Sequence, residues 1–292
     1  MIQINKNSNT LLRIKELINN LRYLEGISQN SNINIASFSF ITPLSITPIA
    51  SIINSKSLKY IYEDNNNSYL ETILFPNGIN MYDNIFTNKT YIPIIHLDIN
   101  HLSENELNSQ LNLLNDNYMS ILKTNIITEK RFIKLITETT ISYFLGEMFA
   151  NIEEHSKAKN IYIFSQYWQK SNSCEICIID DGQGLYNSLK NAGRNVINSK
   201  DALSSILERG LSAKNEFGEI QRGTGLKTTK ALLINNELKG EFFIMSGNAA
   251  YFQSSKDKGI FINLSNYSWQ GTIIMLKFKS PINQFSLYDY VK

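Results

Sequence analysis

The sequence predicts an α/β protein: a small unit of β-α-β-α-β order, followed by an α/β sandwich in which helices cover one face of a mixed sheet. Two observations support this class. Short alternating or apolar runs typical of strands recur between stretches whose apolar residues have helical spacing. In the N-terminal third the two kinds of run interleave, which indicates parallel crossovers. The 292 residues suffice for about two domains with large cores.

Composition excludes several classes of protein. The net charge is only +2 and 18% of the residues are charged, so a nucleic-acid partner is not indicated. No apolar run approaches the length of a membrane span, and residues 1–6 lack the apolar core of a signal peptide. We therefore expect a cytoplasmic protein without a membrane span.

The N-terminal unit, residues 1–125, is expected to be a regulatory or partner-docking domain. Thr42 and Pro43 give a helix-start signal, and the polar helix 102–122 is interpreted as a connector. The other expected elements are a helix at 8–25, a strand at 33–41, a helix up to 53, a strand at 58–63, a helix at 68–75 and a strand at 91–97.

The second domain is expected to span residues 126–292. It should begin with one long or slightly bent helix over 128–155. The expected strands follow at 161–164, 175–179 and 240–246, then a hairpin of 251–253 with 259–263, and a last strand at 271–278.

Cys174 and Cys177 form a C-x2-C pattern that could suggest a zinc or redox site. They lie in an expected strand, where positions three apart point to opposite faces of the sheet. A zinc site would also need two more ligands at a suitable spacing. We therefore expect two separate structural cysteines.

Three short motifs carry the functional signal. In the first, Glu147, Asn151 and His155 recur every four residues, so all three share one polar stripe on a helix whose other face is apolar. The second is Asp180-Asp-Gly-Gln-Gly184, where a strand ends in a loop that lets backbone approach a ligand closely. The third is Gly223-Thr-Gly-Leu226 before a helix, which suits a phosphate at a helix N-terminus.

In this order, E-x3-N, D-x-G-x-G and G-x-G-L resemble the N, G1 and G2 boxes of the GHKL superfamily (gyrase, heat-shock chaperone, histidine kinase, MutL), whose domain is the Bergerat ATP-binding fold. The likeness covers about residues 130–280. It extends to Gly-Leu-Ser-Ala-Lys214, where the family has its ATP lid, and to Gly271-Thr272. With His155, the first box is closest to the anti-sigma-factor serine kinases. Residues 38–44 resemble the start of STAS-like regulatory domains, the alternative being an unrelated docking domain.

The resemblance implies ATP or ADP and Mg²⁺ as ligands. Asp180 would accept a hydrogen bond from the amine of adenine, Thr272 would help to hold the base, and Asn151 would bind magnesium through its hard amide oxygen. Glu147 would be the general base. The remaining expected nucleotide-binding residues are Gly182, Gly184, Lys214, Arg222, Gly223, Thr224, Gly225 and Leu226.

Several of these residues also have a purely structural alternative. Asp180 could cap a turn, Thr272 could be an ordinary strand residue, and His155 could bond free carbonyls at a helix end. The function also stays open between three classes. These are a kinase that phosphorylates a partner protein, an ATPase that forms a homodimer on ATP as gyrase and MutL relatives do, and a nucleotide-sensing module with little catalysis.

Overall fold

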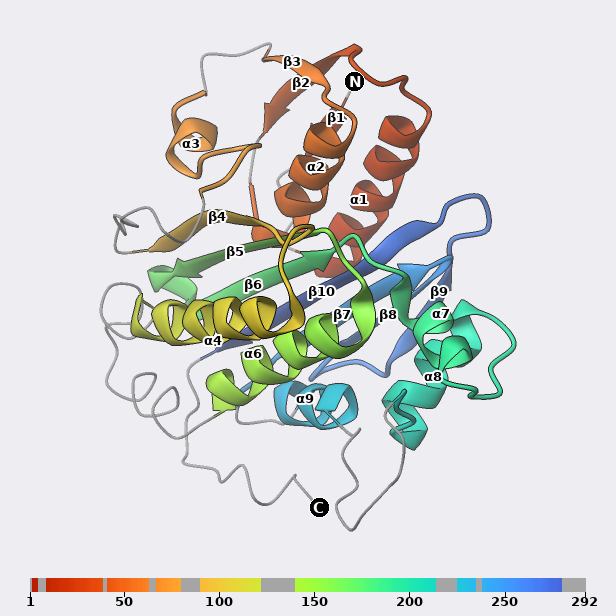
Figure 1. The fold of residues 1–292 in the computed structure, drawn as a ribbon. Coiled ribbons are helices and arrows are strands. Elements are labelled where there is room, and N and C mark those ends of the chain that lie inside the picture. The colour runs from red at the N-terminus through yellow and green to blue at the C-terminus, as the bar shows by residue number, and fades with distance from the viewer. Residues whose placement is uncertain are drawn as a thin grey trace.

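The computed structural model centres on one large sheet that has helices on both sides (Figure 1). The structure describes residues 2–4, 9–38, 41–62, 67–79, 90–121, 140–213, 225–234 and 238–279. The sheet has seven strands in the order β4-β5-β6-β10-β7-β8-β9, and every neighbouring pair is antiparallel. The strands are β4 (Tyr91–Asp98), β5 (Asn160–Trp168), β6 (Ser173–Asp180), β7 (Glu241–Gly247), β8 (Ala249–Ser254), β9 (Ile260–Asn263) and β10 (Trp269–Lys279).

The sheet differs from the expectation in its direction and its neighbours. A mixed sheet was predicted, but its pairing is antiparallel throughout. The strand at 91–97 was expected in the small N-terminal sheet, whereas β4 pairs with β5 at the edge of the large one. The hairpin of β8 and β9 is confirmed. β10 lies between β6 and β7, in the middle of the sheet.

A second, smaller sheet lies near the N-terminus and is parallel, as predicted. Its order is β1 (Ile2–Ile4), β2 (Asn32–Phe38) and β3 (Lys59–Tyr62). The helices that follow these strands are α1 (Thr10–Glu25), α2 (Pro43–Ser55) and α3 (Asn67–Thr72). Thr42 caps α2 together with Ser45, and Pro43 occupies the first turn, so the predicted helix start is confirmed.

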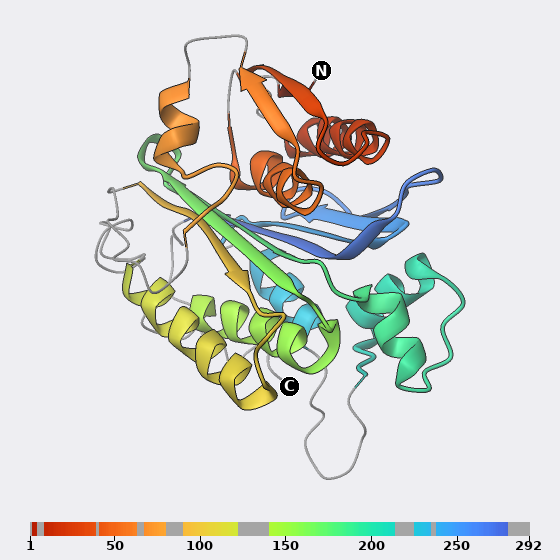
Figure 2. The ribbon, with the colours of Figure 1, turned by 45° about the horizontal axis from the view of Figure 1, so that its top comes forward.

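Different helices pack on the two faces of the large sheet (Figures 1 and 2). One face carries α4 (Glu104–Ile121), α6 (Thr140–Asn151) and α9 (Gly225–Ile234), with α7 (Gly184–Asn191) and α8 (Ser199–Ser204) towards the β8 side. The other face carries α1 and α2. Helices were expected on one face only, because the sequence does not show that the N-terminal helices cover the back of the same sheet.

Strand β6 shows how both faces become buried, since all eight of its residues are buried. Cys174, Ile176 and Ile178 pack into the core beneath α4, α6 and α9. Cys177 and Ile179 pack against α1 and α2. The two cysteines are free thiols on opposite faces, as predicted. Burial raises the pKa of both thiols, so neither is activated as a nucleophile.

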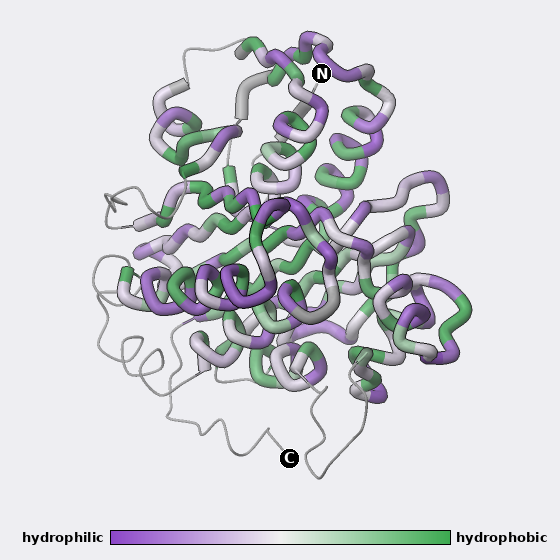
Figure 3. Tube along the Cα trace, in the orientation of Figure 1, coloured by the Kyte–Doolittle hydropathy of each residue, from purple (hydrophilic) through white to green (hydrophobic). Residues whose placement is uncertain are grey.

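The expected connector, α4, is a packed element. It is largely hydrophilic along its length (Figure 3), yet its apolar stripe is buried against the sheet. The long helix expected over 128–155 is described from Thr140, and it ends in a π-helical turn, Ile152–Ser156. None of the helices in the described residues is both long and apolar enough to cross a membrane.

A buried ion pair joins α1 to the large sheet. The Arg13 Nη1 atom lies 3.1 Å from Glu175 Oε2, and the two side chains are 4% and 0% exposed. The backbone N–H of Leu44, in the first turn of α2, donates to Glu175 Oε1 at 3.0 Å. The N-terminal helices are therefore attached to the sheet by both apolar packing and a specific polar contact.

Candidate functional site

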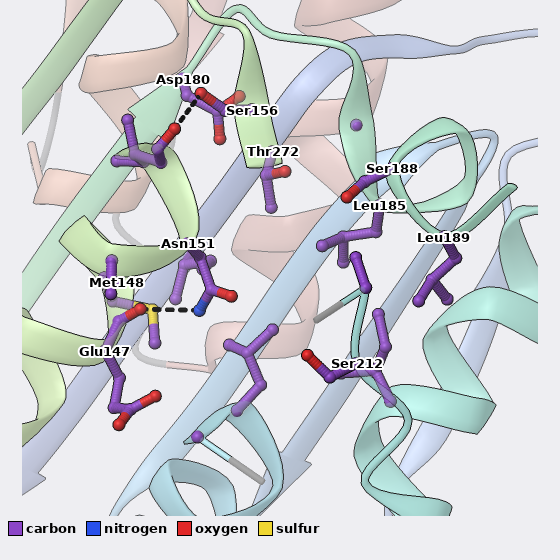
Figure 4. A pocket seen from close by; sticks show the side chains of 18 of the residues that line it. Glu147, Met148, Asn151, Ser156, Asp180, Leu185, Ser188, Leu189, Ser212 and Thr272 are labelled. Atoms are coloured by element: carbon purple, nitrogen blue, oxygen red, sulfur yellow. Dashed lines mark hydrogen bonds between the residues drawn. The ribbon is translucent and has the colours of Figure 1, made fainter. Parts of the chain in front are cut away.

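A pocket of about 80 Å³ lies between α6, the ends of β6 and β10, the start of α9 and the segment after β6 (Figure 4). That volume has room for about six water molecules. Predicted residues from all three motifs line this pocket: Glu147, Asn151, Asp180, Gly184, Gly225, Leu226 and Thr272. Its apolar wall is formed by Met148, Ile152, Ile178, Leu185, Leu189, Ile206, Leu211 and Ile274.

Asp180, the last residue of β6, is the buried carboxylate of the pocket. It pairs in register with Thr272 on β10, and its Oδ1 accepts from the Gly182 N–H at 2.9 Å. The side chain is nearly inaccessible to water, and this burial raises its pKa to about 7, although hydrogen bonds from Gly182 and Thr272 favour the ionised form. No ion pair neutralises Asp180 among the residues that the structure describes.

The glycines of the second motif allow the loop to pass through a narrow space. A Cβ on Gly182 would lie 2.1 Å from the carbonyl oxygen of Ser156, which excludes any side chain there. Gly184 has a φ of +73°, and its Cβ would lie 2.9 Å from Ser246 Oγ. Both glycines are therefore required by the close approach of this loop to its neighbours.

Glu147 and Asn151 occupy adjacent turns of α6, as predicted. Asn151 Nδ2 donates to the Glu147 carbonyl at 2.7 Å, which turns the amide oxygen towards the cavity (Figure 4). The Glu147 carboxylate lies against Gly225, the first residue of α9, where a Cβ would be 1.7 Å from Oε2. Gly225 thus provides the space that the carboxylate fills.

Two residues that sequence reasoning missed hold the Asp-Gly loop in place. Ser156 accepts from the Gln183 N–H at 2.6 Å through its carbonyl, and its hydroxyl donates to the Ile152 carbonyl at 2.7 Å. Asp181 accepts from the backbone N–H of Lys159 at 2.7 Å and of Asn160 at 2.8 Å. Ser156 carries no signal in the sequence, whereas Asp181 is one of the paired aspartates at the strand end.

Some predicted residues fall where the structure gives no description. Lys214, Arg222, Gly223 and Thr224 lie outside the described residues, and so does the side chain of His155. Within the described ranges, no group of three or more His, Cys, Asp or Glu side chains could hold a metal ion. A magnesium ion here would therefore need ligands of another kind, such as the Asn151 amide oxygen and the oxygens of a phosphate.

No model of a known protein family matches the chain, and no curated protein matches its sequence.

Proposed function

We propose that this pocket binds Mg-ATP, that the domain is a GHKL-type Bergerat fold, and that the protein transfers the γ-phosphate to a hydroxyl of a partner protein. The observation that carries the proposal is the Asp180 carboxylate, which is buried at the pocket wall without a cation beside it in the described residues. The hydrogen bonds from Gly182 and Thr272 do not offset the cost of burying this carboxylate, since its pKa is still raised, so a further donor from a ligand would be favoured. The exocyclic amine of adenine is such a donor.

The other pocket residues suit the remaining parts of the nucleotide. Apolar side chains from β6, β10 and α6 would contact the base, and the Asn151 amide oxygen would contribute to magnesium binding. Glu147 lies one helical turn from Asn151, and its carboxylate meets the start of α9. From there it could accept the proton of an attacking hydroxyl. Bound magnesium would neutralise charge on the phosphates.

Calorimetry tests the binding role of Asp180. Wild-type protein should bind ATP with magnesium and bind GTP far more weakly, because guanine has a carbonyl where adenine has the amine. Asp180→Asn should weaken ATP binding by about 10²-fold, since it places a donor opposite a donor. Asp116→Asn, on the exposed side of α4, is the matched control and should bind normally. Equal affinities for ATP and GTP would remove the base-reading role.

Measurements of ATP turnover and of its products test the proposed reaction. Glu147→Ala should keep ATP affinity within about threefold and lose about 10² to 10⁴ in rate. Incubation with γ-labelled ATP and host lysate separates the reactions, because a labelled foreign protein indicates a kinase and free phosphate alone indicates an ATPase. Binding without either product would favour a sensing module.

A further inference from the structure

A second cavity, of about 840 Å³, lies at the other end of β10 from the Asp180 pocket. Its walls come from the N-terminal end of α1, the start of β7, the turn between β8 and β9, and the end of β10. Thr272 and Lys279 mark the two cavities on the same strand, and seven residues of strand span roughly 23 Å. We call this second cavity the β10-end groove.

Positive charge dominates the β10-end groove. Four exposed lysines line it, namely Lys239, Lys256, Lys258 and Lys279. None of them forms an ion pair with any residue that the structure describes. Two carboxylates also line the groove, but both already have partners. Glu241 is bonded to Lys277 Nζ at 3.0 Å and to the Thr10 hydroxyl, and Asp257 accepts from Ser254 Oγ at 2.7 Å.

The groove also has apolar surface beside β9, which pairs on one side only among the strands that the structure describes. Leu11, Phe252 and Ile260 contribute to its lining, and Ile260 is 39% exposed. Ile260 opens β9, which is the last strand of the large sheet. α1 has no acidic residue in its first turn, so its dipole adds to the positive potential there. A ligand for this groove should therefore combine negative charge with apolar groups.

We propose that the β10-end groove binds an acidic, extended segment of a partner protein. Such a segment can pair spaced carboxylates with the lysines while its apolar side chains cover Ile260 and its backbone runs along β9. A nucleic acid fits less well, because its bases would not cover the apolar side chains of Leu11 and Ile260 as an extended peptide would. The described residues of the wall also include no arginine that could bind a phosphate in a bidentate manner.

Fluorescence anisotropy with a labelled peptide of alternating glutamate and leucine tests this proposal. The peptide should bind the full chain, and binding should weaken when salt rises from about 50 to about 300 mM. Lys256→Glu/Lys258→Glu should weaken it by about tenfold or more. Lys170→Glu/Lys190→Glu changes the net charge equally at exposed positions outside the groove, and should stay within about twofold of wild type. Lys239→Ala/Lys279→Ala removes the other two lysines and should also weaken binding.

Two results would overturn the proposal. Equal losses in the groove variant and in its charge-matched control would mean that only net charge matters. Oligothymidylate that binds as tightly as the peptide, with the same sensitivity to Lys256→Glu/Lys258→Glu, would assign the groove to nucleic acid. No nucleotide enters the assay, and Asp180→Asn should not change peptide affinity, so this proposal and the proposed function can fail separately.

Discussion

Two buried carboxylates on the same strand have opposite surroundings: one is paired with an arginine, and the other is not. Glu175 and Asp180 are five residues apart on β6, so they point to opposite faces of the sheet. Glu175 is fully buried and receives the Arg13 guanidinium and the Leu44 N–H. Asp180 is almost as buried but has no ion pair within the described part of the chain, and burial raises its pKa to about 7.

The difference separates a carboxylate that stabilises the fold from one that, in the proposed function, accepts a hydrogen bond from a ligand. A buried charge that is matched by an arginine and a backbone donor holds elements together, and removing one partner is costly. A buried carboxyl with a raised pKa in a cavity costs stability in the absence of a ligand, and such groups concentrate at functional sites.

The largest effect is expected at the ion pair. Arg13→Met leaves Glu175 buried without its cation, and should lower the free energy of unfolding by about 3–5 kcal/mol in urea titrations. Lys15→Met, on the exposed side of the same helix, should change it by less than about 0.5 kcal/mol. Arg13→Met/Glu175→Leu should recover most of the loss. A cost below about 1 kcal/mol for Arg13→Met would show that the pair is not structural.

Asp180→Asn should raise the free energy of unfolding, whereas Arg13→Met should lower it. The pKa of Asp180 in the folded protein, about 7, lies above its ordinary value of 3.8, so the folded state holds a proton between these values that the unfolded state has released. Its contribution to stability is therefore fully present below about pH 4 and is lost as pH rises to about 7. Asparagine removes this loss, and should stabilise the protein by on the order of 2–4 kcal/mol at pH 8.

Thermal melts across pH measure that difference. The gap between Asp180→Asn and wild type should widen from pH 4 to pH 7 and then stay constant. A gap that is the same at every pH would mean that Asp180 does not carry a displaced proton, and the contrast with Glu175 would weaken.

A third carboxylate, that of Glu147, depends on the space left by a glycine, Gly225. Gly225→Ala would place a Cβ 1.7 Å from the present position of Glu147 Oε2 and so displace that carboxylate. We expect turnover of ATP to fall by about 10²-fold. Gly146→Ala is the matched control, because a Cβ there meets no atom within 4 Å and should add about 0.5–1 kcal/mol of helix stability. Equal activity in both variants would contradict the role of Glu147.

The smallest effect is expected in the pH dependence of adenosine binding. Adenosine is the suitable ligand because it has no phosphates, whose own titration between about pH 6 and about pH 8 would obscure that of Asp180. An amine can donate fully only to the ionised form of Asp180, so lowering the pH from about 8 to about 6 should weaken adenosine binding by roughly tenfold. Asp180→Asn should remove this pH dependence together with most of the affinity. Calorimetry in buffers of different ionisation enthalpy would count the proton released.

Local patterns predicted the parts of the structure that depend on neighbouring residues. Helical spacing placed Glu147 and Asn151 on one face of α6, and strand alternation put Cys174 and Cys177 on opposite faces of β6. The Thr42-Pro43 signal gave the start of α2. In each case the residues that decide the conformation lie within one or two turns, or within one strand, of each other.

Contacts between residues far apart in the sequence could not be predicted from local patterns. The residues of β4 form a strand in either sheet, and only the packing of the whole chain places them beside β5. Arg13 lies in a helix with many polar residues, and Glu175 lies in an apolar strand. Neither segment alone indicates that the two side chains form an ion pair, since they are 162 residues apart in the sequence. The acceptor role of Ser156 likewise depends on a backbone carbonyl, which no residue type reveals.

The placement of β4, α1 and α2 has a practical consequence for anyone who divides this chain. A fragment that starts at residue 126, where the nucleotide-binding half was expected to begin, would lose the strand that covers the edge of β5. It would also expose Ile179, Phe243 and Met275, which α1 and α2 cover in the whole protein. Bare strand edges and wide apolar patches promote self-association. We therefore expect such a fragment to precipitate on expression unless residues 9–121 are supplied with it, covalently or as a separate chain.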